Sequence, residues 1–229
     1  MASTEVSEEN DPHIGTLNES SLHAALKEAY SAPGDEFEVP LDRFVIDIRR
    51  HDLLIEIQTS SFASMGRKLD HLLPEHRILL VHPIAVETTL VRDDRRRRSP
   101  KRGSIYNLLG ELVSIPTLLD HPNLSLEVVL TKIDAIQVHD PKLRRRRGGY
   151  RTIDRQLTEI VEQHRFENAE DLLTLLPDGL PHEFTTADLA AAGGFDRSIA
   201  QQMAYCFRAL HFFDERGRTK AGIHYRLAV

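Results

Sequence analysis

The residues best suited to chemistry lie in one short stretch, residues 44–59, which reads FVIDIRRHDLLIEIQT. Two runs rich in branched apolar residues flank the polar RRHD, which predicts a β-hairpin with a four-residue loop at residues 49–52. Side chains alternate along each strand, so this register gives each face of the hairpin its own set. One face carries Asp47, Leu54, Glu56 and Gln58, and the other carries Ile46, Ile48, Leu53, Ile55 and Ile57. Acids and an amide on an aliphatic hairpin are costly unless solvated, paired or bound to a ligand.

Asp47 and Glu56 are diagonal neighbours in this hairpin, with backbones about 7–8 Å apart. Carboxylates at this spacing can hold a cation between them, and Mg²⁺ binds carboxylates together with waters. The alternative is that the two acids pair with Arg49, Arg50 or Lys68 on an exposed sheet face. Both interpretations are compatible with the residues alone.

The elements that must position these acids follow from the apolar pattern around the hairpin. Asn18 is a good N-cap for a helix whose apolar stripe includes Leu22 and Leu26. The remaining expected elements are a strand at 36–39, the hairpin, a helix at 60–76, strands at 77–84 and 85–92, a helical stretch at 104–116, and one or two strands at 124–138. This order predicts an α/β fold with a mixed sheet flanked by helices.

Composition limits the classes of protein to which the chain can belong. Hydrophobic residues make up 41% of the chain and aromatic residues 6%, which predicts a sizeable, mainly aliphatic core. Cys206 is the one cysteine, so an internal disulfide framework is excluded and a reducing, cytoplasmic location is expected. No apolar run approaches the ~18–20 residues that cross a bilayer, and the acidic N-terminus does not resemble a signal peptide, so no membrane partner is expected.

The net charge of −6 conceals a strong segregation of charge along the chain. Residues 1–42 contain ten acidic residues and one basic residue, Lys27, whereas the middle third contains two arginine clusters. The clusters, proposed to bind nucleic acid, comprise Arg95, Arg96, Arg97, Arg98, Lys101 and Arg102, and then Arg144, Arg145, Arg146 and Arg147. They predict a polyanionic partner, DNA or RNA. The alternative is that they are solvated loops or a linker.

The chain divides into four parts on this evidence. They are a disordered acidic tail at 1–15, a sheet domain at 16–140, a basic linker at 141–152 and a smaller domain at 153–229. The smaller domain is expected to contain helices at 153–164 and 169–176, a helix capped by Thr185 or Thr186, and a longer helix capped by Asp196. A hairpin at 212–227, with its turn at residues 216–218, completes this domain.

This order is typical of a winged helix-turn-helix, and the C-terminal unit resembles that class of domain. The resemblance implies that Arg197, Gln201 and Gln202 on the longer helix contact nucleic acid. It also implies that Arg216 and Arg218 on the hairpin contact phosphates, which position a protein without specifying sequence. Since winged helices also serve as protein-contact modules, a protein-interaction adaptor is an alternative.

The first part resembles the PD-(D/E)XK nuclease superfamily, whose core runs helix, three-stranded meander, helix, strand. Asp47 matches the aspartate at the end of the second strand, and Glu56 matches the glutamate of the third strand. Gln58 lies where the lysine usually occurs, which gives the ExQ variant. Glu19 matches an acidic residue that many members carry in the first helix. The resemblance covers residues 17–84 for the core and extends to 138 for the whole domain.

The resemblance implies a Mg²⁺- or Mn²⁺-dependent DNA endonuclease or nickase. Asp47, Glu56 and the Ile57 backbone carbonyl would be metal ligands, with Glu19 completing the site. Gln58 would orient the attacking water, and Lys68 would supply the missing positive charge. Alternatives are a nuclease fold that has lost its activity and a DNA-binding regulator. Cutting both strands with one centre per chain would require a homodimer.

Overall fold

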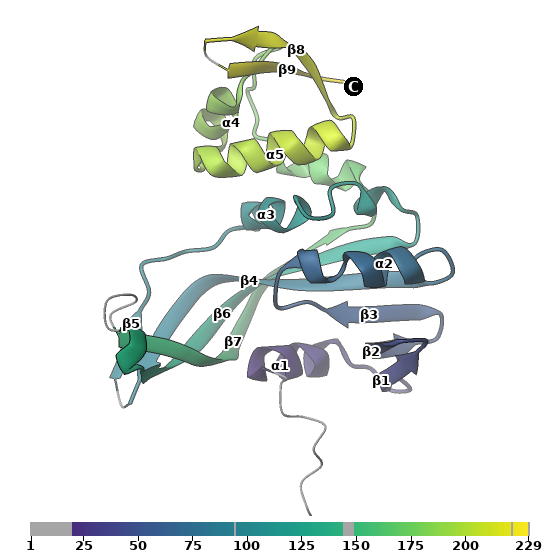
Figure 1. The fold of residues 1–229 in the computed structure, drawn as a ribbon, viewed down its shortest axis with the longest axis vertical. Helices are drawn as coiled ribbons and strands as arrows, with labels where there is room; N and C mark the ends of the chain where they lie inside the picture. Colours follow the sequence, from purple (N-terminus) through teal and green to yellow (C-terminus); the bar gives the residue numbers. More distant parts are fainter. Residues whose placement is uncertain (1–19, 94, 144–148, 221, 229) are drawn as a thin grey trace, which may run out of the picture.

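A computed structural model describes residues 20–93, 95–143, 149–220 and 222–228. A large mixed sheet flanked by helices forms its centre (Figure 1), as the apolar pattern predicts. The sheet strands are β1 (Glu36–Leu41), β2 (Phe44–Arg50), β3 (Leu53–Ile57), β4 (Arg77–Arg92), β5 (Arg95–Arg98), β6 (Leu124–His139) and β7 (Tyr150–Phe166). Their order is β1-β2-β3-β4-β6-β7, and β5 pairs with the end of β4. The expected tail, Glu19 and Arg144–Arg147 lie outside the described residues.

The central strands β3, β4 and β6 are parallel, and β1, β2 and β7 extend the sheet in antiparallel fashion. Parallel strands are covered on both faces, which is why the first halves of β4 and β6 are nearly continuous apolar runs. The crossover from β3 to β4 contains the 3₁₀ turn η1 (Phe62–Ser64) and helix α2 (Gly66–Leu72). The crossover from β4 to β6 contains η2 (Ile105–Asn107), α3 (Leu108–Leu112) and η3 (Leu118–Asp120).

Helix α1 (Ser21–Tyr30) covers one face of the sheet and packs against β3 and β7. Its cap is Ser20, whose hydroxyl accepts a hydrogen bond from the His23 backbone N–H, so the expected cap at Asn18 was wrong. Leu22 and Leu26 are buried on this face against a cluster that includes Ile55. The opposite face is covered by α2 and α3.

The hairpin between β2 and β3 is tighter than expected. Arg50 pairs with Leu53, so the turn is the two residues His51 and Asp52, with His51 at φ +54°. A two-residue hairpin turn needs positive φ, which histidine tolerates better than β-branched residues do. The ladder ends at the pair of Ile48 and Ile55, and beyond it the two strands diverge. The predicted four-residue loop was therefore wrong, and so was the face of Ile46, which packs with Leu54.

Strand β7 replaces the helix that was expected at residues 153–164. Its seventeen residues run antiparallel to β6 over nearly the full length of that strand. The segment QLTEIVEQH is rich in helix-forming residues, but pairing with the otherwise open edge of β6 overrides local propensity. As the edge strand, β7 leaves Ile153 and Val161 exposed. The sheet therefore continues through the expected boundary at 152/153 and ends at Phe166.

The C-terminal residues form η6 (Glu170–Leu175), α4 (Thr186–Gly193), α5 (Arg197–Ala209) and the hairpin β8 (Phe213–Thr219) and β9 (Gly222–Leu227). The expected cap at Thr185 is confirmed, since Thr185 forms a capping box with Asp188. Asp196 occupies the N-cap position of α5 but makes no side-chain cap hydrogen bond. The turn of the hairpin lies between Thr219 and Gly222, so the expected turn at 216–218 was wrong. Gly217 lies instead at a β-bulge, with φ +148°.

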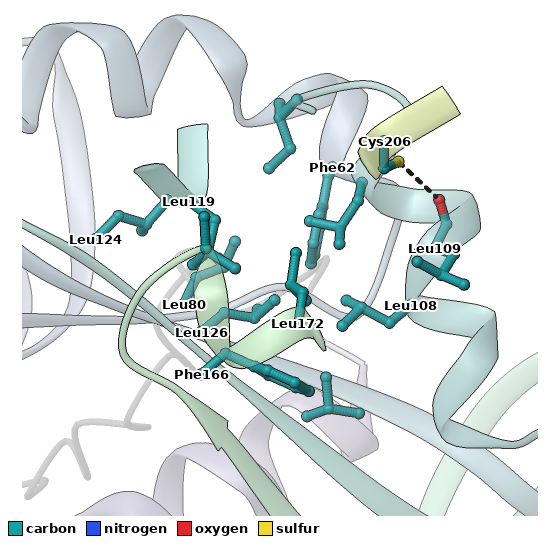
Figure 2. Close-up of a cluster of buried hydrophobic side chains, with 14 of the residues drawn as sticks. Phe62, Leu80, Leu108, Leu109, Leu119, Leu124, Leu126, Phe166, Leu172 and Cys206 are labelled. Atoms are coloured by element: carbon teal, nitrogen blue, oxygen red, sulfur yellow. Dashed lines mark hydrogen bonds between the residues drawn. The ribbon is translucent and has the colours of Figure 1, made fainter. Parts of the chain in front are cut away.

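One hydrophobic core joins the sheet to the C-terminal helices. Phe62, Leu80 and Leu108 belong to the same buried cluster as Met203 and Phe207 of α5. Figure 2 shows the contact between α3 and α5, where the Cys206 thiol lies 3.8 Å from the Leu109 carbonyl oxygen and donates to it. Burial raises the pKa of the Cys206 thiol to about 12, so this cysteine is a packing residue. Within the described ranges, no helix is long and apolar enough to cross a membrane.

A first prediction concerns Gly103, which follows the first arginine cluster. A Cβ at this position would lie 2.5 Å from the Ala85 carbonyl oxygen and 2.9 Å from the Ile84 side chain. Since backbone cannot yield cheaply, Gly103→Ala is expected to lower the free energy of unfolding by about 1–3 kcal/mol. Gly66→Ala is the matched control, because nothing lies within 4 Å of that added Cβ. Urea unfolding measures both, and equal effects would contradict this account.

Candidate functional site

Asp47 lies where β2 and β3 separate, and its side chain replaces the lost backbone pairing. Its Oδ2 accepts a hydrogen bond of 2.8 Å from the Ile57 N–H. His23 of α1 places its Nε2 3.2 Å from the same oxygen. Burial by itself would raise the pKa of Asp47, but the hydrogen bonds from His23 and Ile57 hold it below its ordinary value. Asp47 is therefore an ionised, largely buried acceptor fixed by α1 and β3.

Glu56 is buried to 5% exposure in the middle of the sheet. Lys68 of α2 places its Nζ 2.5 Å from the Glu56 Oε1, and the same ammonium donates to the Val45 carbonyl oxygen at 2.6 Å. Burial raises the pKa of Glu56 to about 7; the charge of Lys68 opposes that rise and the charge of Asp47 adds to it. The two carboxylates are thus close enough to repel each other.

Four elements therefore bring His23, Asp47, Glu56 and Lys68 together. The expectation that Asp47 and Glu56 lie near each other, with α2 facing them, agrees with this geometry. Arg49 and Arg50 do not take part, because Arg49 pairs with Glu36 and Arg50 with Asp35. Ion pairs with Arg49, Arg50 or Lys68 were the alternative expected for the two acids. Of these, the pair between Lys68 and Glu56 is present.

Gln58 was expected to orient an attacking water, but its side chain is hydrogen-bonded to the loop that follows it. Its side-chain amide donates to the Ser60 hydroxyl, the Ser61 carbonyl and the Ser64 hydroxyl, at 2.8–2.9 Å. These bonds hold the loop that leads into α2, so Gln58 positions the helix that carries Lys68. Ile57 was expected to offer its backbone carbonyl, but the group that contacts this site is its backbone N–H, which donates to Asp47. The described residues contain no group of three His, Cys, Asp or Glu side chains placed to hold a metal ion.

His82 is a buried residue beside the site that the sequence pattern did not single out. It lies on β4, and its Nδ1 donates to the Gln58 carbonyl oxygen at 2.7 Å. Its ring stands edge-on to Phe62, with 4.8 Å between centroids. Burial lowers the pKa of His82, so the ring is neutral at neutral pH. A histidine in the apolar run RILLVHPI was the available signal, since a polar group there requires a buried partner.

The first arginine cluster is largely a strand rather than a loop. Arg96 pairs with Asp134 of β6, with 2.6 Å between nitrogen and oxygen, and Arg98 pairs with Glu87 of β4. Arg102 also lies near Glu87, at 3.9 Å, and Lys101 is exposed. Arg95 and Arg97 point to the other side of β5 and line a surface hollow.

The expected nucleic-acid residues of the C-terminal unit fall into two groups. Arg197, Gln201, Arg216 and Arg218 are exposed. Gln202 is half-buried against α3, where its side-chain nitrogen would lie 3.3 Å from a Cβ on Gly110. Its side chain therefore packs between two helices, and its contact with nucleic acid stays a prediction. Gln202 directly follows the exposed Gln201 in α5, and its inward position depends on the packing of α3 against this helix.

Comparison with known proteins places the chain in a family. The chain belongs to the family described as Domain of unknown function (DUF8091), which matches residues 20–167. That match ends one residue beyond β7, where the sheet ends. The chain is also similar to a protein from Treponema pallidum (strain Nichols) named "Uncharacterized protein", with 33% identity over 223 residues that cover 90% of this chain and 86% of that protein. No solved structure matches the chain.

The raised pKa of Glu56 predicts a pH dependence of stability. Between about pH 4.5 and 7 the folded protein holds a proton on Glu56 that the unfolded chain has lost. Stability from this residue is therefore full below pH 4.5 and falls as the pH rises towards 7. Replacing Glu56 by glutamine is expected to flatten that fall.

Urea unfolding at about pH 4.5, 6 and 7.5 measures this change in slope. Glu36→Gln, at an exposed carboxylate of β1, is the matched control and is expected to retain the wild-type slope. A Glu56→Gln slope equal to that of the wild type would show that the buried carboxyl titrates at its ordinary pKa.

Proposed function

We propose that this protein is a metal-dependent endonuclease or nickase of the PD-(D/E)XK type, acting on DNA, with RNA as the alternative polyanion. The observation that carries the proposal is the meeting of Asp47 and Glu56, from adjacent strands, with the Lys68 ammonium at 2.5 Å from Glu56. The element order α1-β1-β2-β3-α2-β4 supports it, since this is the order of the superfamily core. A basic side chain beside the acids supplies the charge that Gln58 lacks.

Two carboxylates are donors of the kind that Mg²⁺ or Mn²⁺ takes. Mg²⁺ is commonly held by one or two carboxylates, with waters and substrate phosphates completing its shell. Asp47 and Glu56 would provide those carboxylates, and the Ile57 carbonyl and Glu19 would be further ligands. A bound Mg²⁺ supplies stabilisation of developing negative charge and activation of water.

The protein's own side chains have distinct roles in this proposal. His23 and the Ile57 N–H keep Asp47 ionised and oriented. Lys68 balances the charge of Glu56 in the free protein and can contact a substrate phosphate when the carboxylate is engaged elsewhere. Gln58 fixes the loop before α2 rather than the attacking water.

The C-terminal unit is proposed to be a winged helix that holds nucleic acid. The exposed side of α5 carries Arg197, Gln201 and Tyr205, and together with β9 it forms a hollow of about 280 Å³. Arg208 on the same side is paired with Glu215 of β8, at 3.4 Å. Arg216 and Arg218 on the hairpin would contact phosphates. A cytoplasmic location, expected from the single cysteine, belongs to the same proposal.

The second candidate is a nuclease fold that binds nucleic acid without cutting it. Two observations favour it: Lys68 already pairs with Glu56, and the side-chain amide of Gln58 is hydrogen-bonded within its own loop. Both candidates predict salt-sensitive binding of DNA. They differ in whether the acids have a catalytic role.

Supercoiled plasmid incubated with the purified full chain separates the two candidates. The proposed nuclease is expected to convert plasmid to nicked or linear forms with Mg²⁺ or Mn²⁺, and chelation by EDTA is expected to stop it. Binding of the plasmid without conversion, with either ion, would favour the second candidate and overturn the first.

A further inference from the structure

A basic hollow lies among residues of β4, β5 and the start of β7. Figure 1 labels β5 at the end of the sheet where these strands lie. The hollow measures about 500 Å³ and is lined by Leu90, Arg92, Asp93, Arg95, Arg97 and Tyr150. Three arginines against one aspartate give this lining a net positive charge.

Alternation along β5 divides its four arginines into two pairs. Arg96 and Arg98 project to one side, where Asp134 and Glu87 neutralise them. Arg95 and Arg97 project to the other side, into the hollow. Neither forms an ion pair with an acidic side chain among the residues that the structure describes. Half of this cluster is therefore structural, and the other half is available to a ligand.

The register of β4 and β5 places like charges opposite each other. Arg92 pairs directly with Arg95, and Leu90 pairs with Arg97, so Arg92, Arg95 and Arg97 share one face. Like charges directly opposite across a ladder destabilise a sheet unless a counter-charge lies between them. An anion in the hollow would offset this repulsion.

Arg92 is held in place before any ligand arrives. Its Nε donates to the Gln137 side-chain oxygen at 2.9 Å, and its guanidinium carbon lies 3.9 Å from the centre of the Tyr150 ring. A stacked, hydrogen-bonded guanidinium loses little conformational entropy on binding, and its terminal amino groups suit the oxygens of a phosphate. Arg95 and Arg97 supply two further cations on the same face.

We infer that this hollow is a phosphate-binding site formed by Arg92, Arg95 and Arg97. The phosphate belongs to a nucleic-acid backbone or to a small phosphate ester, which share the same chemistry. The inference deepens the proposed function, because it rests on the polyanionic partner, but it does not depend on cleavage. The sequence suggested that all of Arg95–Arg98 bind the polyanion. The inference assigns binding to Arg95 and Arg97 and a structural role to Arg96 and Arg98.

Neighbouring residues of β5 provide the matched variants. Arg97→Ala and Arg98→Ala each remove one exposed positive charge from the same strand, so a long-range effect of charge would be equal in both. When Arg98 is replaced, Glu87 still has the basic side chain of Arg102 nearby. Arg95→Ala and Arg96→Ala form a second pair, with thermal unfolding used to check the fold of each variant.

Fluorescence anisotropy of a labelled DNA duplex, recorded in EDTA across a series of salt concentrations, measures binding without cleavage. Arg97→Ala is expected to weaken binding by about tenfold and to reduce the salt slope by about one, whereas Arg98→Ala is expected to weaken it by less than about twofold. Equal effects of the two variants would overturn the site.

A second arm, calorimetry with inorganic pyrophosphate, identifies the source of the phosphate. Binding of pyrophosphate that depends on Arg97, without binding of the duplex, would support the site and assign it to small phosphate esters. Binding of neither ligand would overturn it. A chain that binds duplex through Arg97 but never cuts plasmid would contradict only the nuclease proposal.

Discussion

Replacing Asp47 by asparagine is expected to reduce plasmid cleavage by at least about 100-fold, since even residues that only support a metal ligand change activity by 10- to 100-fold. The amide oxygen can still accept the hydrogen bond from the Ile57 N–H, so the divergence of β2 and β3 is preserved. What is lost is the negative charge, which the proposed Mg²⁺ site requires. Glu56→Gln is expected to have an effect of the same order.

The control for this experiment is Asp42→Asn. Asp42 is an exposed carboxylate near the start of β2 that pairs with His71 at 2.9 Å. Its replacement removes the same charge from the same sheet but not from the site, and cleavage is expected to stay within about twofold of the wild type. Cleavage that survives both Asp47→Asn and Glu56→Gln would show that another centre, or another protein, cuts the DNA.

Replacing Phe207 by alanine is expected to lower the free energy of unfolding by about 3–5 kcal/mol. Phe207 is fully buried in α5, and its ring meets those of Phe212 and Phe213 edge-on, at 5.8 and 5.2 Å between centroids. It belongs to the cluster that also contains Phe62 and Leu80 of the sheet region. The substitution is therefore expected to destabilise the sheet as well as the C-terminal unit.

Urea unfolding measures the loss, and hydrogen exchange locates it. Amides of α3 and α2 are expected to lose protection together with those of α5, because all three helices share one core. Tyr205→Ala is the matched control: Tyr205 is 51% exposed on the same helix, and its removal is expected to change stability by less than about 1 kcal/mol. Two separate unfolding transitions would contradict a shared core.

The proximity of Asp47 and Glu56 could be predicted because both lie on one hairpin, where short-range rules apply. Alternation along β2 and β3 places Asp47 and Glu56 on one face of the hairpin. The position of Lys68 depends in addition on the packing of α2 over that face. The register of the hairpin was wrong because RRHD permits both a two- and a four-residue loop, and the choice depends on a positive φ at His51. That choice changes which residues face each other without separating the acids.

Features that depend on distant pairing could not be predicted. The segment that forms β7 has helix-forming residues, and the open edge of β6 decides its structure. The division of the arginines in β5 is similar, because Glu87 and Asp134 lie 11 and 38 residues from their partners in the chain. Only the register of β4, β5 and β6 brings them together.

The length of β4 has a consequence for how nucleic acid would lie on the protein. Glu56 pairs with Leu80 near the start of this strand, whereas the basic hollow begins at Leu90. The span from Leu80 to Leu90 is about 33 Å at the usual rise of a strand, close to one helical turn of a DNA duplex. The bulge between Ala85 and Glu87 adds one residue to β4, so Leu90 lies on the opposite face of the sheet from Leu80. A duplex that reached both the arginines and the acidic pair would therefore have to pass around an edge of the sheet. Fragments much shorter than one turn could engage either end but not both.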